Sequence, residues 1–144
     1  MIHVGNILSL FYSPPQGRIE ASEIILDQKG IIDDKHYDKN IERSVLITSL
    51  DSYNIVKENG IDISLGSLGE NILIDYNPYH LTTGSRLQIG NLTLEISQHC
   101  TLCKSLTKVD GKLPKLLKDD RGIFAKVIKP GIIKKGDNIY LLTV

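Results

Sequence analysis

The sequence lacks an excess of charge of either sign. Its 144 residues hold 17 Lys and Arg against 17 Asp and Glu. A broad basic face is therefore not expected, and neither is a nucleic-acid partner, although this balance still allows a local basic patch. The chain also lacks any apolar run that approaches the ~20 residues needed to span a bilayer, so we expect no membrane partner.

The first residues lack the features of a secretory signal. Residues 1–6 show no basic segment followed by a long apolar segment, so we expect a cytoplasmic protein. No internal repeat, low-complexity tract or linker interrupts the chain, and its length is sufficient for one core. We therefore expect a single domain over residues 1–144.

Cysteine is scarce, and both cysteines, Cys100 and Cys103, fall in one short segment. A reducing compartment disfavours a structural disulfide, which leaves free thiols, a metal site or redox chemistry. The pair follows a strand-like run over 92–97 and lies beside His99 and Lys104, whose positive charge would favour the thiolate. Cys103 is therefore a candidate for sulfur chemistry, with a buried core cysteine as the alternative.

Several interpretations of Cys100 stay open. The two cysteines form a lone Cys-x-x-Cys, the spacing of thioredoxin-like redox pairs, but the βαβ setting of those pairs is missing here. A zinc site would need two further ligands, which His36, His80 or His99 could supply only through folding. The plainest alternative is a small residue with no chemical role.

Short β-branched runs between frequent turn signals predict a mostly β fold with a barrel-like core and one or two short helices. Gly90-Asn91 predicts a two-residue hairpin turn. The expected strands are Val4–Leu10, Ser44–Ile47, Asn71–Asp75, Arg86–Ile89, Leu92–Ser97, Ile123–Ile128 and Asn138–Leu142.

The clearest helix signal follows the second of these strands. Thr48 or Ser49 is a suitable cap, and Asn59-Gly60 is a suitable left-handed end. Shorter helical turns are expected over Cys103–Thr107 and over Pro114–Lys118, where proline suits a first-turn position.

A set of short phrases follows one order along the chain: 30–36 (Gly-Ile-Ile-Asp-Asp-Lys-His), 43–45 (Arg-Ser-Val), 69–72 (Gly-Glu-Asn-Ile), Cys103, and 122–127 (Gly-Ile-Phe-Ala-Lys-Val) with Gly131 and Gly136-Asp137. Taken together, the phrases resemble the MOSC family, the domain named after the C-terminal part of molybdenum-cofactor sulfurases. The resemblance extends from about Val4 to Leu142.

The resemblance implies a barrel-like domain whose cysteine carries sulfur as a persulfide and which binds a molybdenum- or tungsten-pterin cofactor, or a substrate passed to one. The reactive cysteine of the family matches Cys103, which would also be the metal ligand if the chain binds a molybdenum centre. The residues matching the family's ligand-holding phrases are Asp34-Lys35-His36, Arg43 and Glu70-Asn71.

This sequence departs from the family pattern in three places. Lys35 stands where arginine is usual, and lysine is a point charge without the bidentate fork. The usual Arg-x-Pro-Cys reads Cys100-Thr101-Leu102-Cys103, which makes Cys100 a possible resolving thiol that discharges sulfur by forming a disulfide with Cys103. Pyridoxal phosphate is associated with the family through the desulfurase part of the large sulfurases. Nothing here resembles that part, so no bound pyridoxal phosphate is expected.

Four basic residues, Lys35, Arg43, Arg121 and Lys126, would form a cationic pocket for a phosphate-bearing ligand if their loops converge. Ordinary solvated charge is the alternative for each. It is favoured for Lys126, which alternates with apolar neighbours on an expected strand and should face away from them.

The remaining candidates each have a structural alternative. His36, flanked by aspartates, would serve as proton donor or anion ligand, or is a loop histidine with a backbone partner. Glu70 would anchor a pocket arginine and Asn71 would hydrogen-bond the edge of a heterocycle, so that the pair orients a ligand; the alternative is that they only stabilise a turn. Gly131 and Gly136-Asp137 are interpreted as architectural.

The main hypothesis is a sulfur-carrier protein that receives sulfur on Cys103 from a cysteine desulfurase-type donor and passes it to a molybdoenzyme or cofactor-synthesis protein. One alternative is a molybdenum-dependent reductase of N-hydroxylated compounds, with electrons from a partner because the chain has no flavin or iron–sulfur motif. The others are a non-catalytic binding module for the same partners and a thiol–disulfide oxidoreductase that uses Cys100 and Cys103.

Overall fold

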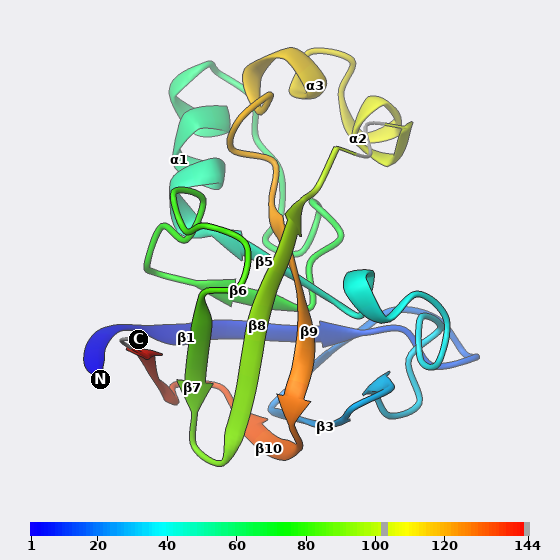
Figure 1. Cartoon of the computed structure of the whole chain (residues 1–144). Coiled ribbons are helices and arrows are strands. Elements are labelled where there is room, and N and C mark those ends of the chain that lie inside the picture. The colour runs from blue at the N-terminus through cyan, green and yellow to red at the C-terminus, as the bar shows by residue number, and fades with distance from the viewer. Residues whose placement is uncertain (102–103, 143–144) are drawn as a thin grey trace.

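The computed structural model describes residues 1–101 and 104–142, and over this part of the chain seven strands close into a barrel (Figure 1). The two strands at the ends of the order, β11 (Asn138–Leu142) and β1 (Ile2–Tyr12), also pair with each other, which closes the barrel. The mostly β, barrel-like fold expected from the sequence is thus confirmed. The order is β11 (Asn138–Leu142), β7 (Arg86–Ile89), β8 (Leu92–His99), β9 (Ile123–Lys129), β5 (Val45–Ser49), β6 (Ile72–Ile74) and β1 (Ile2–Tyr12).

Strand β1 runs across the whole barrel and changes partner along its length (Figure 1). Its first half pairs with β11, its second half with β6, and its last residues with the short strand β2 (Ile19–Ala21). The register shifts between His3 and Gly5 and again between Ile7 and Ser9. Irregularities of this kind bend a strand, which lets one strand serve two sides of a closed sheet.

Strands β5 and β6 pair in parallel, and the crossover between them includes the helix α1 (Leu50–Glu58). Parallel neighbouring strands need a crossover of this kind, because a tight turn reverses the chain direction and can join only antiparallel strands. The Ser49 side chain caps α1 by accepting a hydrogen bond from the Asp51 N–H. Asn59 ends the helix, and Gly60 follows with φ +77°. Both predicted boundaries of this helix are confirmed.

A second, three-stranded sheet was not predicted. It has the order β10 (Gly131–Lys134), β3 (Glu23–Asp27) and β4 (Gly30–Ile31), all antiparallel. Its Ile24, Leu26, Ile31 and Ile133 belong to the same buried cluster as the barrel interior. The sheet therefore covers one end of the barrel, opposite the helices (Figure 1).

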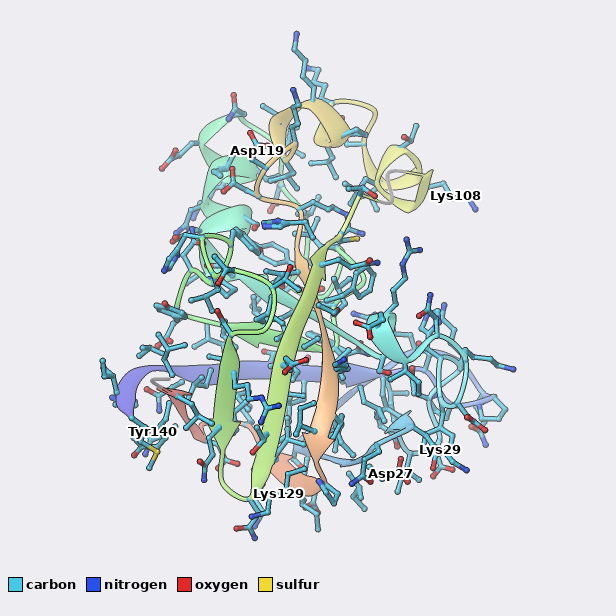
Figure 2. All side chains as sticks on the ribbon, in the orientation of Figure 1. Asp27, Lys29, Lys108, Asp119, Lys129 and Tyr140 are labelled. Atoms are coloured by element: carbon cyan, nitrogen blue, oxygen red, sulfur yellow. The ribbon has the colours of Figure 1, made fainter. Side chains whose placement is uncertain are left out.

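Three short α-helices lie in the described residues, compared with the one or two expected. With α1, the helices α2 (Lys104–Val109) and α3 (Leu113–Leu116) gather at one end of the barrel (Figure 1). A separate apolar cluster holds them there, consisting of Tyr53, Val56, Leu68, Leu73, Leu106, Leu113 and Leu117. Figure 2 shows Lys108 and Asp119 at this helical end and Lys129 at the opposite end. In the described ranges, no helix is long and apolar enough to cross a bilayer.

Candidate functional site

A cavity of about 420 Å³, called the chamber below, opens between the segments that follow β1, β4, β8 and η1 (Ile41–Arg43). Its volume falls within the range typical of small-molecule sites. Asp34 is the acidic residue of its lining over the described chain. Its basic residues are Arg18, Lys35, Lys39, Arg43 and Arg121, together with His36.

The loop after β4 forms the rim of the chamber, and its shape depends on Asp34. The Asp34 carboxylate is buried and accepts hydrogen bonds from the backbone N–H of Ser13 at 2.7 Å and of His36 at 3.1 Å. These bonds fasten the loop to the end of β1 and leave Lys35 and His36 exposed at the rim. The acidic residue is therefore occupied in holding the loop, while its basic neighbours Lys35 and His36 line the cavity.

Arg43 is brought to the chamber by the short 3₁₀ helix η1. Asn40 caps this helix by accepting from the Glu42 N–H, and Arg43 is the last helical residue. Its guanidinium lies over the ring of Phe124, 5.7 Å from the centroid. Cation–π contact of this kind favours one orientation of the guanidinium and leaves its N–H edge available to an anion.

The deep wall of the chamber comes from the facing ends of β8 and β9. Cys100 follows β8, and its N–H donates to the carbonyl of Gly122 at 2.9 Å. Its side chain is 3% exposed and packs with Leu46 and Phe124 in a small apolar cluster. Arg121, which directly precedes Gly122, is 5% exposed and lines the same cavity. The chamber thus has an apolar floor beside a buried guanidinium.

Glu70 does not line the chamber but lies fully buried behind its wall. Its Oε2 accepts hydrogen bonds from Thr48 Oγ1 at 2.6 Å and from the Tyr53 hydroxyl at 2.5 Å. Burial, together with the charge of Glu70, raises the pKa of Tyr53 far above its ordinary value, so this hydroxyl stays protonated and remains a donor. The guanidinium of Arg18 lies 3.6 Å from Glu70 Oε1.

Asn71 lines the chamber, yet its amide already has two backbone partners. Its Oδ1 accepts from the Leu46 N–H at 3.0 Å, and its Nδ2 donates to the Phe11 carbonyl at 3.2 Å. The side chain therefore ties β5 to β1 across the start of β6. This arrangement supports the structural interpretation of Asn71 more directly than ligand orientation.

The structure brings together Lys35, His36, Arg43, Asn71, Arg121 and Cys100 in one cavity. It does not bring Lys126 there: Lys126 forms ion pairs with Glu42 at 3.2 Å and Glu95 at 3.4 Å on the outer wall. Cys103, the candidate for sulfur chemistry, lies outside the described residues. Across the described ranges, no group of three or more His, Cys, Asp or Glu side chains is placed to hold a metal ion.

Sequence reasoning missed two basic residues of the chamber, Arg18 and Lys39. Arg18 follows residues 14–17 (Pro-Pro-Gln-Gly), which in the sequence indicate only a turn. Its position depends on contacts with Gly66 and Glu70, which are 48 and 52 residues away in the sequence. No local signal marks such a residue. Lys39 is carried by the same loop as Lys35 and could have been included for that reason.

A wider and more open cavity of about 860 Å³, called the outer groove below, adjoins the chamber. Arg18, Asp34, Lys35 and Lys39 belong to the lining of both cavities, as does Ser13. The groove continues over the turn at 14–17 to Tyr37, whose hydroxyl donates to Asp27. The shared wall is therefore mainly basic.

A family model described as the MOSC domain matches residues 3–140 of this chain. None of the curated proteins matches the sequence. Among solved structures, the YuaD protein from Bacillus subtilis is similar with a TM-score of 0.83 and 18% identity, over 94% of this chain and 94% of that one.

The two YiiM structures are also similar in fold. YiiM from Escherichia coli has a TM-score of 0.74 and 17% identity, over 96% of this chain and 70% of that one. YiiM from Geobacillus stearothermophilus has a TM-score of 0.71 and 14% identity, over 99% and 75%. At these identities the likeness concerns the fold alone.

Proposed function

Because the chain belongs to the MOSC domain family, which is associated with molybdenum-cofactor function, we propose that its chamber binds the anionic part of a molybdenum- or tungsten-pterin cofactor, and that Cys103 carries sulfur for it as a persulfide. The proposed partners are a cysteine desulfurase-type donor and a molybdoenzyme or cofactor-synthesis acceptor.

The observation that carries the proposal is the convergence of Arg18, Lys35, Lys39, Arg43 and Arg121 on one cavity against a single acidic residue of its described lining. Guanidinium groups bind phosphate oxygens through paired N–H groups, and lysines add positive charge at the rim. The set therefore fits a phosphate-bearing ligand. Leu46 and Phe124 add an apolar surface to the same lining.

When bound, the cofactor supplies a metal centre for oxygen- or sulfur-atom chemistry. The residues of this chain hold its anionic group: Arg43 and Arg121 at depth, and Lys35, His36 and Arg18 toward the mouth. Three peptide units connect Cys103 to Cys100 on the chamber wall, a chain length of at most about 11 Å. This tether supports a role for Cys103 near the ligand.

The loading step is a thiol exchange. The Cys103 thiolate attacks the terminal sulfur of the donor's persulfide, forming a new S–S bond on Cys103 while the donor's S–S bond breaks and the donor leaves as a thiolate. Release of the outer sulfur as hydrosulfide needs two electrons, which Cys100 and Cys103 supply by forming a disulfide. The Cys100 thiolate attacks Sγ of the Cys103 persulfide, and hydrosulfide leaves. An external dithiol must then reduce the Cys100–Cys103 disulfide.

Intact mass after incubation with a pyridoxal-phosphate-dependent cysteine desulfurase and cysteine tests the proposal. We expect wild type to gain one sulfur, Cys103→Ala to gain none, and Cys100→Ala to retain the sulfur longest because its discharge is blocked. Sulfur on Cys103→Ala, or on none of the proteins, would overturn the carrier function.

A cofactor-binding module without sulfur transfer is the second candidate. The observation that favours it is the burial of Cys100 among apolar side chains, because a structural cysteine packed in this way is chemically inert. Binding of a pterin cofactor by Cys103→Ala with unchanged affinity, combined with no sulfur gain by wild type, would establish this alternative.

A further inference from the structure

Glu70 is a fully buried acid directly behind a wall of basic residues. We infer that Glu70 is a positioning residue, whose carboxylate fixes the Arg18 guanidinium at the wall shared by the chamber and the outer groove, and that Arg18 binds a phosphate-type anion there. The inference rests on the proposed function only in taking the chamber as an anion site.

The hydrogen bonds of Glu70 leave one side of its carboxylate for Arg18. Thr48 and Tyr53 both donate to Oε2, whereas Oε1 accepts no hydrogen bond in the described part of the chain. Arg18 Nη2 lies 3.6 Å from Oε1, which is an ion pair longer than a hydrogen bond. A buried carboxylate requires a nearby cation, and Arg18 fills that position.

Arg18 is held by one nitrogen. Its Nη2 donates to the carbonyl of Gly66 at 3.0 Å and to the carbonyl of Glu70 at 2.5 Å, and the guanidinium lies 4.9 Å from the centre of the Phe11 ring. In the described ranges, Nε and Nη1 of Arg18 make no hydrogen bond. The side chain is 32% exposed. A guanidinium fixed in this way keeps N–H groups for a ligand.

The location of Arg18 differs from that of the other basic residues. Lys35 and Lys39 are exposed on the loop after β4, with no ion pair among the described residues. Arg18 lines both cavities and is held by the main-chain carbonyls of Gly66 and Glu70, by the Phe11 ring and by its ion pair with the Glu70 carboxylate. Preorganised arginine loses little freedom when it binds an oxyanion, so it contributes more affinity than a mobile lysine.

Two roles for Glu70 predict opposite results. If Glu70 only balanced the positive charge of the wall, its neutralisation would strengthen the binding of an anion. If it positions Arg18, the same neutralisation weakens binding, although a negative charge has been removed from behind the site. The substitution Glu70→Gln therefore separates the two roles by the sign of its effect.

The experiment is a calorimetric titration of the full chain with inorganic phosphate, for wild type, Arg18→Gln, Glu70→Gln and the double variant. Arg18→Gln should weaken binding by about tenfold, and Glu70→Gln by about fivefold. The double variant should bind no more weakly than Arg18→Gln, because Glu70 acts only through Arg18. Arg86 is exposed and pairs with Glu95 at 3.1 Å on the outer wall, so Arg86→Gln removes the same charge away from both cavities and should bind as wild type does.

A second variant and a second readout cover poor folding of Glu70→Gln. Glu70→Asp keeps the charge but withdraws it from Arg18, and it should give an intermediate loss of affinity. In ¹H–¹⁵N spectra of wild type, the Arg18 Nε–H signal, assigned through Arg18→Gln, should shift on addition of phosphate. An unmoved signal overturns the role of Arg18.

The remaining outcomes are equally decisive. Tighter or unchanged binding by Glu70→Gln overturns the positioning role, as does a double variant whose loss is the sum of both single losses. If wild type binds phosphate and Arg18→Gln binds it equally well, the inference fails while the proposed anion chamber stands. If wild type binds no phosphate, both the inference and the chamber's proposed role fail.

Discussion

Tyr79 shows how a single buried side chain joins the helical end of the molecule to the barrel. Its hydroxyl accepts a hydrogen bond from the Ser49 N–H at 2.8 Å and lies 2.7 Å from Ser52 Oγ, which in turn donates to the Asp120 carbonyl. The residue is 8% exposed. Burial raises the pKa of Tyr79 to about 12, because the phenolate would lose its hydration.

This raised pKa predicts an alkaline loss of stability. In the unfolded chain the pKa of Tyr79 is near its ordinary value of 10. Below that pH the folded and unfolded states both keep the proton, and the full contribution of Tyr79 to the free energy of unfolding is present. Between about pH 10 and 12 only the unfolded state ionises, so the free energy of unfolding falls as pH rises. Tyr79→Phe cannot ionise, and at neutral pH it should be less stable than wild type by about 1–3 kcal/mol through its lost hydrogen bonds.

The difference between wild type and Tyr79→Phe should therefore narrow as pH rises, by up to roughly 3 kcal/mol between about pH 9 and 12. Urea unfolding at a series of pH values measures both proteins under the same conditions. A difference that stays constant over this interval would contradict the raised pKa of the buried hydroxyl.

At the residue scale, the sequence indicated those chamber residues that belong to recognisable phrases. Lys35, His36 and Arg43 are of this kind, and they line the cavity. Arg18 belongs to no such phrase, and Glu70 could be named but not placed behind the wall. What distinguishes these two is a contact across 52 residues of sequence, which only the closed barrel creates.

At the scale of elements, two of the missed strands, β3 and β10, share a physical cause. In β3 and β10 the buried residues Ile24, Leu26 and Ile133 alternate with Ile25 and Ile132, which are about half exposed. Both the buried and the exposed positions are therefore apolar, so the sequence does not show the alternation of apolar and polar residues that marks a half-buried strand. By contrast, β7 and β8 alternate apolar with polar residues around a Gly-Asn turn and were predicted.

Gly131 begins β10 and is required there for a close approach between strands. A Cβ at this position would lie 2.8 Å from the backbone nitrogen of Leu92 and 3.1 Å from its Cα. Backbone atoms cannot move aside as a flexible side chain would. The architectural role expected for Gly131 thus receives a specific cause, which is packing of β10 against the start of β8.

Gly131→Ala should destabilise the protein by about 1–3 kcal/mol, because β10 must shift away from Leu92. Gly111→Ala is the matched control, since no atom of the described structure lies within 4 Å of a Cβ placed there. Urea unfolding of both variants measures the effect. Equal stabilities for the two alanine variants would show that the sheet tolerates the added methyl group.

At the scale of the whole molecule, charge is balanced in number but separated in space. The chain has equal numbers of acidic and basic residues, yet among the described residues its chamber collects five Lys and Arg side chains and one Asp (Arg18, Lys35, Lys39, Arg43, Arg121 and Asp34). Neighbours in η1 show the separation: Glu42 pairs with Lys126 outside the barrel, while Arg43 lines the chamber. Net charge could not have predicted this distribution, because it depends on how the loops close.

The separation predicts different effects of two substitutions that each remove one positive charge. Arg43→Gln should weaken the binding of inorganic phosphate by about tenfold, because a charge-assisted contact inside the chamber is lost. Lys126→Gln removes a charge whose partners, Glu42 and Glu95, lie on the outer wall. Because salt screens this charge from the chamber, the substitution should leave phosphate affinity nearly unchanged. Titrations at low and at physiological salt would measure both variants beside wild type.

Added salt should also separate the two variants. Phosphate affinity of wild type should fall as salt rises, because the chamber attracts other anions and its field is screened, and Arg43→Gln should show a shallower dependence. Lys126→Gln should follow the wild-type dependence throughout. If instead both variants lost the same affinity at low salt, the molecule would attract anions through its overall field, and the chamber would have no special role. Equal loss is not expected, because Arg43 reaches the cavity over the Phe124 ring whereas Lys126 is occupied by two carboxylates.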